Sequence, residues 1–86
     1  MHTVDILDQA LDLAVRLGYT VRQESFAGSG GGGCELKGRK FFFLDLDLAA
    51  EEQLEQVVAA LRHEPLPPSL IISRELGELL KVRKIA

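Results

Sequence analysis

The chain has 86 residues, of which 47% are hydrophobic and 27% are charged. This length and composition are typical of one folded domain with one core, and they argue against a disordered chain. The formal net charge of −3 argues against a general nucleic-acid-binding protein, because phosphate neutralisation requires clustered cations. We therefore expect residues 1–86 to form a single domain that does not bind nucleic acid.

The cysteine count and the hydropathy of the chain indicate the cellular compartment in which we expect the protein. A single cysteine, Cys34, excludes an intramolecular disulfide framework and a CxxC metal or redox motif. No apolar run approaches the roughly 18 residues that would span a bilayer, and the N-terminus lacks a cationic segment followed by an apolar one. We therefore expect a cytoplasmic protein without a membrane partner.

Apolar residues at helical spacing predict a first helix that is capped by Thr3 and runs to about Leu17, with Gly18 ending it. One apolar stripe holds Val4, Leu7, Leu11 and Ala14, and a neighbouring stripe holds Ile6, Ala10, Leu13 and Leu17. Together the stripes span about 200°, twice what a helix resting on one surface needs. The second stripe therefore needs its own cover, from another helix of the chain or from a partner.

Three strands are expected to follow. Residues 19–26 alternate in polarity, which is compatible with an edge strand. Residues 34–37 and 40–47 flank Gly38 and Arg39, which predict a two-residue hairpin turn with glycine first. Residues 41–44 are apolar on both faces, so we expect this strand at the centre of the sheet with cover on both sides.

Two helices complete the expected fold. The first begins near Ala49 or Ala50 and ends before the prolines of residues 65–68. Ser69 then caps the last helix, although a short strand over residues 69–72 is an alternative. The predicted fold is α+β with the order α-β-β-β-α-α and a three-stranded antiparallel sheet with the helices packed on it.

The glycine run is the least ordinary segment of the sequence. No Lys-Ser or Lys-Thr pair and no helix follow it, which argues against a Walker A loop and a dinucleotide fingerprint. We interpret it mainly as a connection between two strands. In the alternative interpretation a nest of backbone amides binds an anionic small molecule. That site would contain Gly30, Gly31, Gly32, Gly33, Cys34 and Lys37.

The other candidate chemistry favours structural roles. Cys34 shares a strand face with Leu36, so we expect its thiol to point into the core. Asp45 and Asp47 could coordinate a hard cation, but Asp47 also stands where a helix cap belongs. Pro67 stands where a zinc protease motif beginning at His63 needs its second histidine. We expect neither a metal ion nor a cofactor.

Residues 30–61, with the later stretch 66–80, resemble a pattern in small uncharacterised bacterial proteins. Those proteins carry a Gly-Gly-x-Cys segment, then Lys-Gly, an apolar strand that ends in Asp, and a helix that opens near Glu-Gln. The resemblance covers residues 18 to about 80. It implies that residues 31–34, residues 37–38 and Asp45 belong to a shared design, and it implies no function.

The first helix and the strand over residues 41–44 carry more apolar surface than one packing contact covers, and this leads to the main functional hypothesis. We expect a small non-enzymatic protein that self-associates or docks on a protein partner. The expected interface holds Ile6, Leu13, Leu17, Phe41 and Phe43. The alternative is a ligand-binding or thiol-dependent protein that uses the glycine-rich loop and Cys34.

Overall fold

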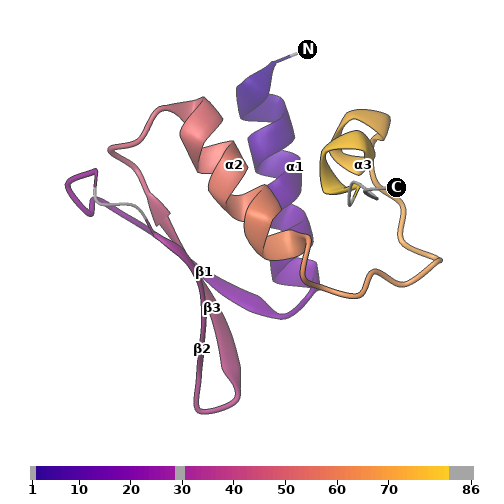
Figure 1. Ribbon diagram of the computed structural model, residues 1–86, viewed down its shortest axis with the longest axis horizontal. Helices are drawn as coiled ribbons and strands as arrows, with labels where there is room; N and C mark the ends of the chain where they lie inside the picture. Colours follow the sequence, from indigo (N-terminus) through magenta and orange to yellow (C-terminus); the bar gives the residue numbers. More distant parts are fainter. Residues whose placement is uncertain (1, 29–30, 82–86) are drawn as a thin grey trace, which may run out of the picture.

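The computed structural model describes residues 2–28 and 31–81. Its elements are α1 (Thr3–Arg16), β1 (Tyr19–Glu24), β2 (Gly32–Leu36), β3 (Arg39–Asp45), α2 (Ala50–Leu61) and α3 (Arg74–Leu80). The α+β class and the predicted element order are confirmed. Figure 1 shows the three helices gathered on one side of the sheet, and α3 packs against both α1 and α2.

The sheet is mixed, and the prediction of a purely antiparallel sheet is wrong. Its strand order is β1-β3-β2, with β1 parallel and β2 antiparallel to β3. β1 and β2 are the two edge strands, and the hairpin after β2 places β3 between them. β3 is the most apolar strand, and its predicted central position is confirmed.

The β2–β3 hairpin turns one residue earlier than predicted. Lys37 and Gly38 both have positive φ angles, of 52° and 78°, and the pair Leu36 and Arg39 flanks them. Two-residue turns with positive φ at both positions match the right-handed twist of the strands they join. Lys37 therefore belongs to the turn rather than to the strand.

The second apolar stripe of α1 is covered by the chain itself. Ile6 and Leu13 are 9% and 2% exposed in the core, and Leu17 packs half-buried against it, so these three expected interface residues serve the fold. The helix begins at Thr3 itself, and His2 rather than Thr3 is the N-cap residue. The buried apolar residues are Ile6, Leu7, Ala10, Leu13, Ala14, Phe42, Leu44, Val57, Val58, Leu61, Leu76 and Leu80.

The last helix begins later than predicted. Ser73 is its N-cap, and the Ser73 hydroxyl accepts a hydrogen bond from the backbone N–H of Leu76 at 3.2 Å. Residues 69–72 form neither a strand nor the start of a helix, so both expectations for this segment are wrong. The hydroxyl of Ser73 also hydrogen-bonds the Gln9 side chain, which ties the start of α3 to α1.

Candidate functional site

The two faces of the sheet are covered unequally. Phe42 and Leu44 point toward the helices and are 0% and 1% exposed. Phe41 and Phe43 point to the opposite face, which no described helix covers, and they are half-buried. The expected cover on both sides of β3 is therefore present on one side only. We call the uncovered side the open face. By strand register it carries Thr20, Arg22, Glu24, Gly32, Cys34, Leu36, Arg39, Phe41, Phe43 and the buried Asp45.

Three aromatic rings occupy the middle of the open face. The rings of Phe41 and Phe43 stack with centroids 6.0 Å apart, and Phe26 packs edge-on against Phe43 at 6.1 Å. The Arg39 guanidinium carbon lies 5.7 Å from the centroid of the Phe41 ring. Leu36, on the neighbouring strand, is 53% exposed. The open face thus carries an apolar strip over β3 and β2, with Arg39 at one end and the exposed ion pair of Arg22 and Glu24 along β1.

A hollow of about 390 Å³ lies beside these rings, with walls from Phe26, Phe43, Cys34 and the glycines 31–33. At Gly32 a Cβ atom would meet nothing within 4 Å, and its φ of +127° disfavours any other residue. At Gly31 a Cβ atom would fall 1.8 Å from the backbone oxygen of Phe43, so only glycine allows this close approach. The missing side chain at Gly31 therefore allows close packing against β3, and the missing side chain at Gly32 leaves the hollow open.

The alternative ligand site is assembled only in part. Gly31, Gly32, Gly33 and Cys34 do lie together, whereas Lys37 lies in the turn at the other end of β2, and Gly30 lies outside the described residues. Among the described residues, no charged side chain lines the hollow. This lining favours an apolar occupant over an anion.

The expected core position of Cys34 is wrong. Cys34 is exposed on the open face, because side chains alternate along a strand and the adjacent Gly33 faces the helices. A Cβ atom at Gly33 would lie 3.3 Å from Cβ of Ala60 in α2. The absence of a side chain at Gly33 lets α2 pack closely on β2.

Asp45 and Asp47 shape the connection that places Phe26 on the open face. Asp45 is 0% exposed, and one of its carboxylate oxygens accepts from the backbone N–H groups of Phe26 and Asp47, both at 3.0 Å. The Asp47 carboxylate accepts from the Ala27 N–H at 2.9 Å and from the Ser25 hydroxyl. Within residues 2–28 and 31–81, no three His, Cys, Asp or Glu side chains are placed to hold a metal ion.

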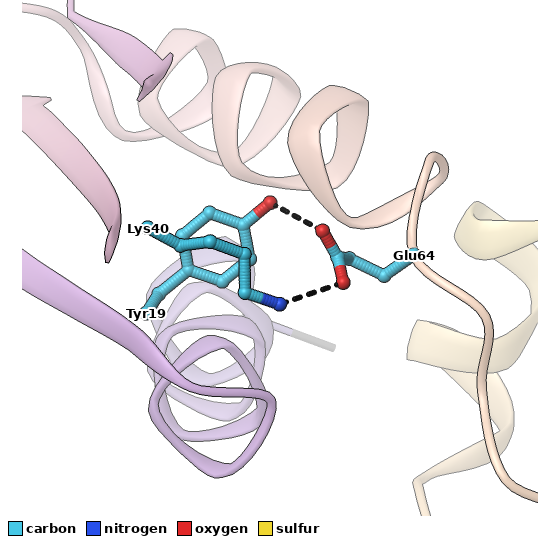
Figure 2. Close-up of polar contacts among 3 residues, drawn as sticks. All are labelled: Tyr19, Lys40 and Glu64. Atoms are coloured by element: carbon cyan, nitrogen blue, oxygen red, sulfur yellow. Dashed lines mark hydrogen bonds and ion pairs between the residues drawn. The ribbon is translucent and has the colours of Figure 1, made fainter. Parts of the chain in front are cut away.

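A polar cluster that the sequence analysis did not find lies on the helix side of the sheet. The Tyr19 hydroxyl donates to Oε2 of Glu64 at 2.8 Å, and Nζ of Lys40 donates to Oε1 of Glu64, also at 2.8 Å (Figure 2). Lys40 also lies 4.8 Å from the centroid of the Tyr19 ring. Tyr19 and Lys40 are neighbours only through the parallel pairing of β1 and β3, so no local pattern could have revealed the cluster.

The cluster links three segments that are distant in the sequence, and we call it the clamp. Burial, and then the hydrogen bond to Glu64, raises the pKa of Tyr19 to about 12, so its hydroxyl keeps its proton at neutral pH. The hydrogen bonds from Lys40 and Tyr19 lower the pKa of Glu64 and hold its carboxylate in the charged form. These bonds join the segment after α2 to the start of β1 and β3.

Comparison of the chain with protein families, with curated proteins and with solved structures finds no match. In the part of the chain that the structure describes, no helix has the length and apolar character needed to cross a membrane.

Proposed function

We propose that this protein acts by self-association, with the open face of one copy packed against the open face of a second. The observation that carries the proposal is the half-buried state of Phe41 and Phe43 on the open face, next to Phe42 and Leu44, which the helices bury on the other face. Two sheets that pack face to face normally bury such side chains between them. A second copy would supply the layer that this short chain lacks.

The charges on the open face favour a second copy as the occupant. Arg39 stands at the N-terminal end of β3, and Glu24 stands beside the C-terminal end of that strand. If the strands of the two copies run antiparallel, each Arg39 approaches Glu24 of the other copy, whose carboxylate also pairs with Arg22 of its own chain at 2.8 Å. A parallel arrangement brings Arg39 against Arg39, which like-charge repulsion disfavours. The face is thus self-complementary in one orientation.

The area of the open face determines how strongly we expect two copies to bind each other. Three strands about 4.8 Å apart and up to about 23 Å long make a face well below the roughly 800 Å² that each partner buries in a stable complex. The dimer is therefore expected to be weak, with a dissociation constant on the order of 10 µM to 1 mM. Association at this strength depends on local concentration.

Sedimentation equilibrium over about 10 µM to 1 mM protein tests the proposal. The wild-type protein should pass from monomer to dimer over this range. Phe41→Arg should remain monomeric, because it places an unpaired charge in the interface. Ile71→Arg is the matched control, because Ile71 is 88% exposed and lies outside the sheet, and this variant should dimerise like the wild type.

Two results would overturn the proposal. One is a wild-type protein that stays monomeric throughout the concentration range. The other is a dimer that Ile71→Arg disrupts and Phe41→Arg does not, which would move the interface away from the sheet.

A further inference from the structure

We propose that the hollow beside Gly32 receives the Phe41 ring of the second copy. This inference rests on the proposed self-association and states how the two faces fit. One copy would insert its Phe41 into the hollow of the other and accept the other ring in return. A two-fold symmetric interface requires such reciprocal contacts.

The walls of the hollow suit an aromatic ring. Phe26 and Phe43 line it with aromatic residues, Cys34 adds a small apolar side chain, and the glycines add only backbone. An apolar cavity of roughly 150 Å³ is large enough to hold benzene. The hollow, at about 390 Å³ and open on one side, therefore has room for a phenylalanine side chain.

The arrangement of the open face makes Phe41 the ring that reaches the hollow. Phe41 and Phe43 are successive outward residues of β3, and the hollow lies beside Phe43. Turning a second copy so that its strands run antiparallel exchanges the positions of these two residues about the middle of the strand. The Phe41 ring of each copy then approaches Phe43 and the hollow of the other.

This fit also gives a reason for glycine at position 32. Gly32 pairs with Phe43 across the strands and therefore points to the open face. Its Cβ position is open space, so within one chain its positive φ favours glycine and no clash with a neighbour does. Any side chain at that position would enter the hollow and compete with the incoming ring.

Two leucine substitutions test whether the Phe41 ring enters the hollow, because they should change the dissociation constant of the dimer in different directions. Cys34 and Thr20 pair with Phe41 from opposite sides, and both are exposed, but only Cys34 lines the hollow. Cys34→Leu should fill the hollow and weaken dimerisation roughly tenfold or more. Thr20→Leu adds apolar surface to the same face without entering the hollow, so its dissociation constant should stay equal to or below that of the wild type.

A featureless apolar face would give the opposite result for Cys34→Leu, because added apolar area would strengthen the dimer. If the wild type dimerises and Cys34→Leu dimerises at least as tightly, the inference fails and the proposed self-association survives. If the wild type never dimerises, the proposed function itself fails. Thermal melting of each variant at low concentration checks that the fold is intact.

Alkylation of the wild-type thiol gives a second measurement that needs no change in the hollow. The rate of reaction of Cys34 with N-ethylmaleimide should fall in proportion to the dimer fraction as protein concentration rises. In a Cys34→Ser/Glu35→Cys control the thiol moves to an exposed position that faces the other side of the sheet, and its rate should not change. A Cys34 rate that is unchanged in a dimeric sample would overturn the inference.

Discussion

The two faces of strand β3 carry similar side chains and have opposite surroundings. Phe42 and Leu44 are fully buried under the helices, whereas Phe41 and Phe43 are half-buried on the open face. Only the topology separates them, because all three helices lie on one side of the sheet. A strand that is apolar on both faces thus indicates two layers of cover, but the chain need not supply both.

The contrast between Phe42 and Phe41 makes the largest prediction. Phe42→Ala should lower the free energy of unfolding by about 3–5 kcal/mol, because it removes a fully buried ring and leaves a cavity. Phe41→Ala should cost about 1 kcal/mol or less in the monomer, because its ring is already partly solvated. Urea denaturation at low micromolar protein measures both. Equal losses would mean that the open face is as well packed as the covered one.

Substitutions of Asp45 and Asp47 measure how much each carboxylate stabilises the loop at the end of the open face. Asp45→Ala should cost about 2–4 kcal/mol, because it removes a buried carboxylate that holds the backbone N–H groups of Phe26 and Asp47. Asp47→Ala removes an exposed acceptor and should cost about 1 kcal/mol or less. The same urea titrations rank the two variants. A larger loss for Asp47→Ala would show that the exposed half of this loop dominates.

Two glycine substitutions distinguish a glycine that is needed for close backbone packing from one that only adds backbone flexibility. Gly31→Ala should cost about 1–3 kcal/mol, since its Cβ atom would collide with the backbone of β3 beneath the open face. Gly77→Ala lies within α3, where the nearest described atom would be 3.7 Å away, and it should raise stability by about 0.5–1 kcal/mol. Melting temperatures should therefore move in opposite directions. A stable Gly31→Ala protein would mean that the crossing segment shifts freely.

Local patterns predicted the elements that depend on neighbouring residues. The span of α2 followed from its apolar spacing and the prolines after it, and the central place of β3 followed from apolar residues on both of its faces. The sequence does not single out Ser73 as the cap of α3, because Ser69 and Ser73 can both cap a helix. In the structure the hydroxyl of Ser73 accepts from the N–H of Leu76 and bonds Gln9 of α1.

The errors at the candidate site have one physical origin. Alternation correctly placed Cys34 and Leu36 on one face, but it could not tell which face the helices cover. Parallel pairing of β1 with β3 is a long-range outcome, and it alone brings Tyr19 beside Lys40. The periodicity of the sequence indicates which face of a strand or helix is apolar. Which element packs on that face depends on contacts between segments that are distant in the sequence.

The smallest prediction compares the ion pairs on the two sides of the sheet. The side chains of Lys40 and Glu64 are 30% and 18% exposed, and those of Arg22 and Glu24 on the open face are 56% and 48% exposed. Glu64→Gln should cost about 1–2 kcal/mol, because its charged form accepts two sheltered hydrogen bonds. Glu24→Gln should cost less than about 0.5 kcal/mol, as exposed pairs usually do.

The pH dependence of unfolding identifies the groups behind that difference. Glu64 has a pKa below its ordinary value of 4.5 in the folded state, so its contribution is present above pH 4.5 and is lost as the pH falls through the folded pKa. Tyr19 has a pKa raised from 10.0 to about 12, so its contribution is present below pH 10 and is lost as the pH rises toward 12. Tyr19→Phe should therefore reduce the alkaline loss, and Glu64→Gln should reduce the acid loss, whereas Glu24→Gln should leave both limbs of the profile unchanged. If Glu24→Gln altered the profile as much as Glu64→Gln, the clamp on the covered side would have no special role in joining the segment after α2 to the sheet.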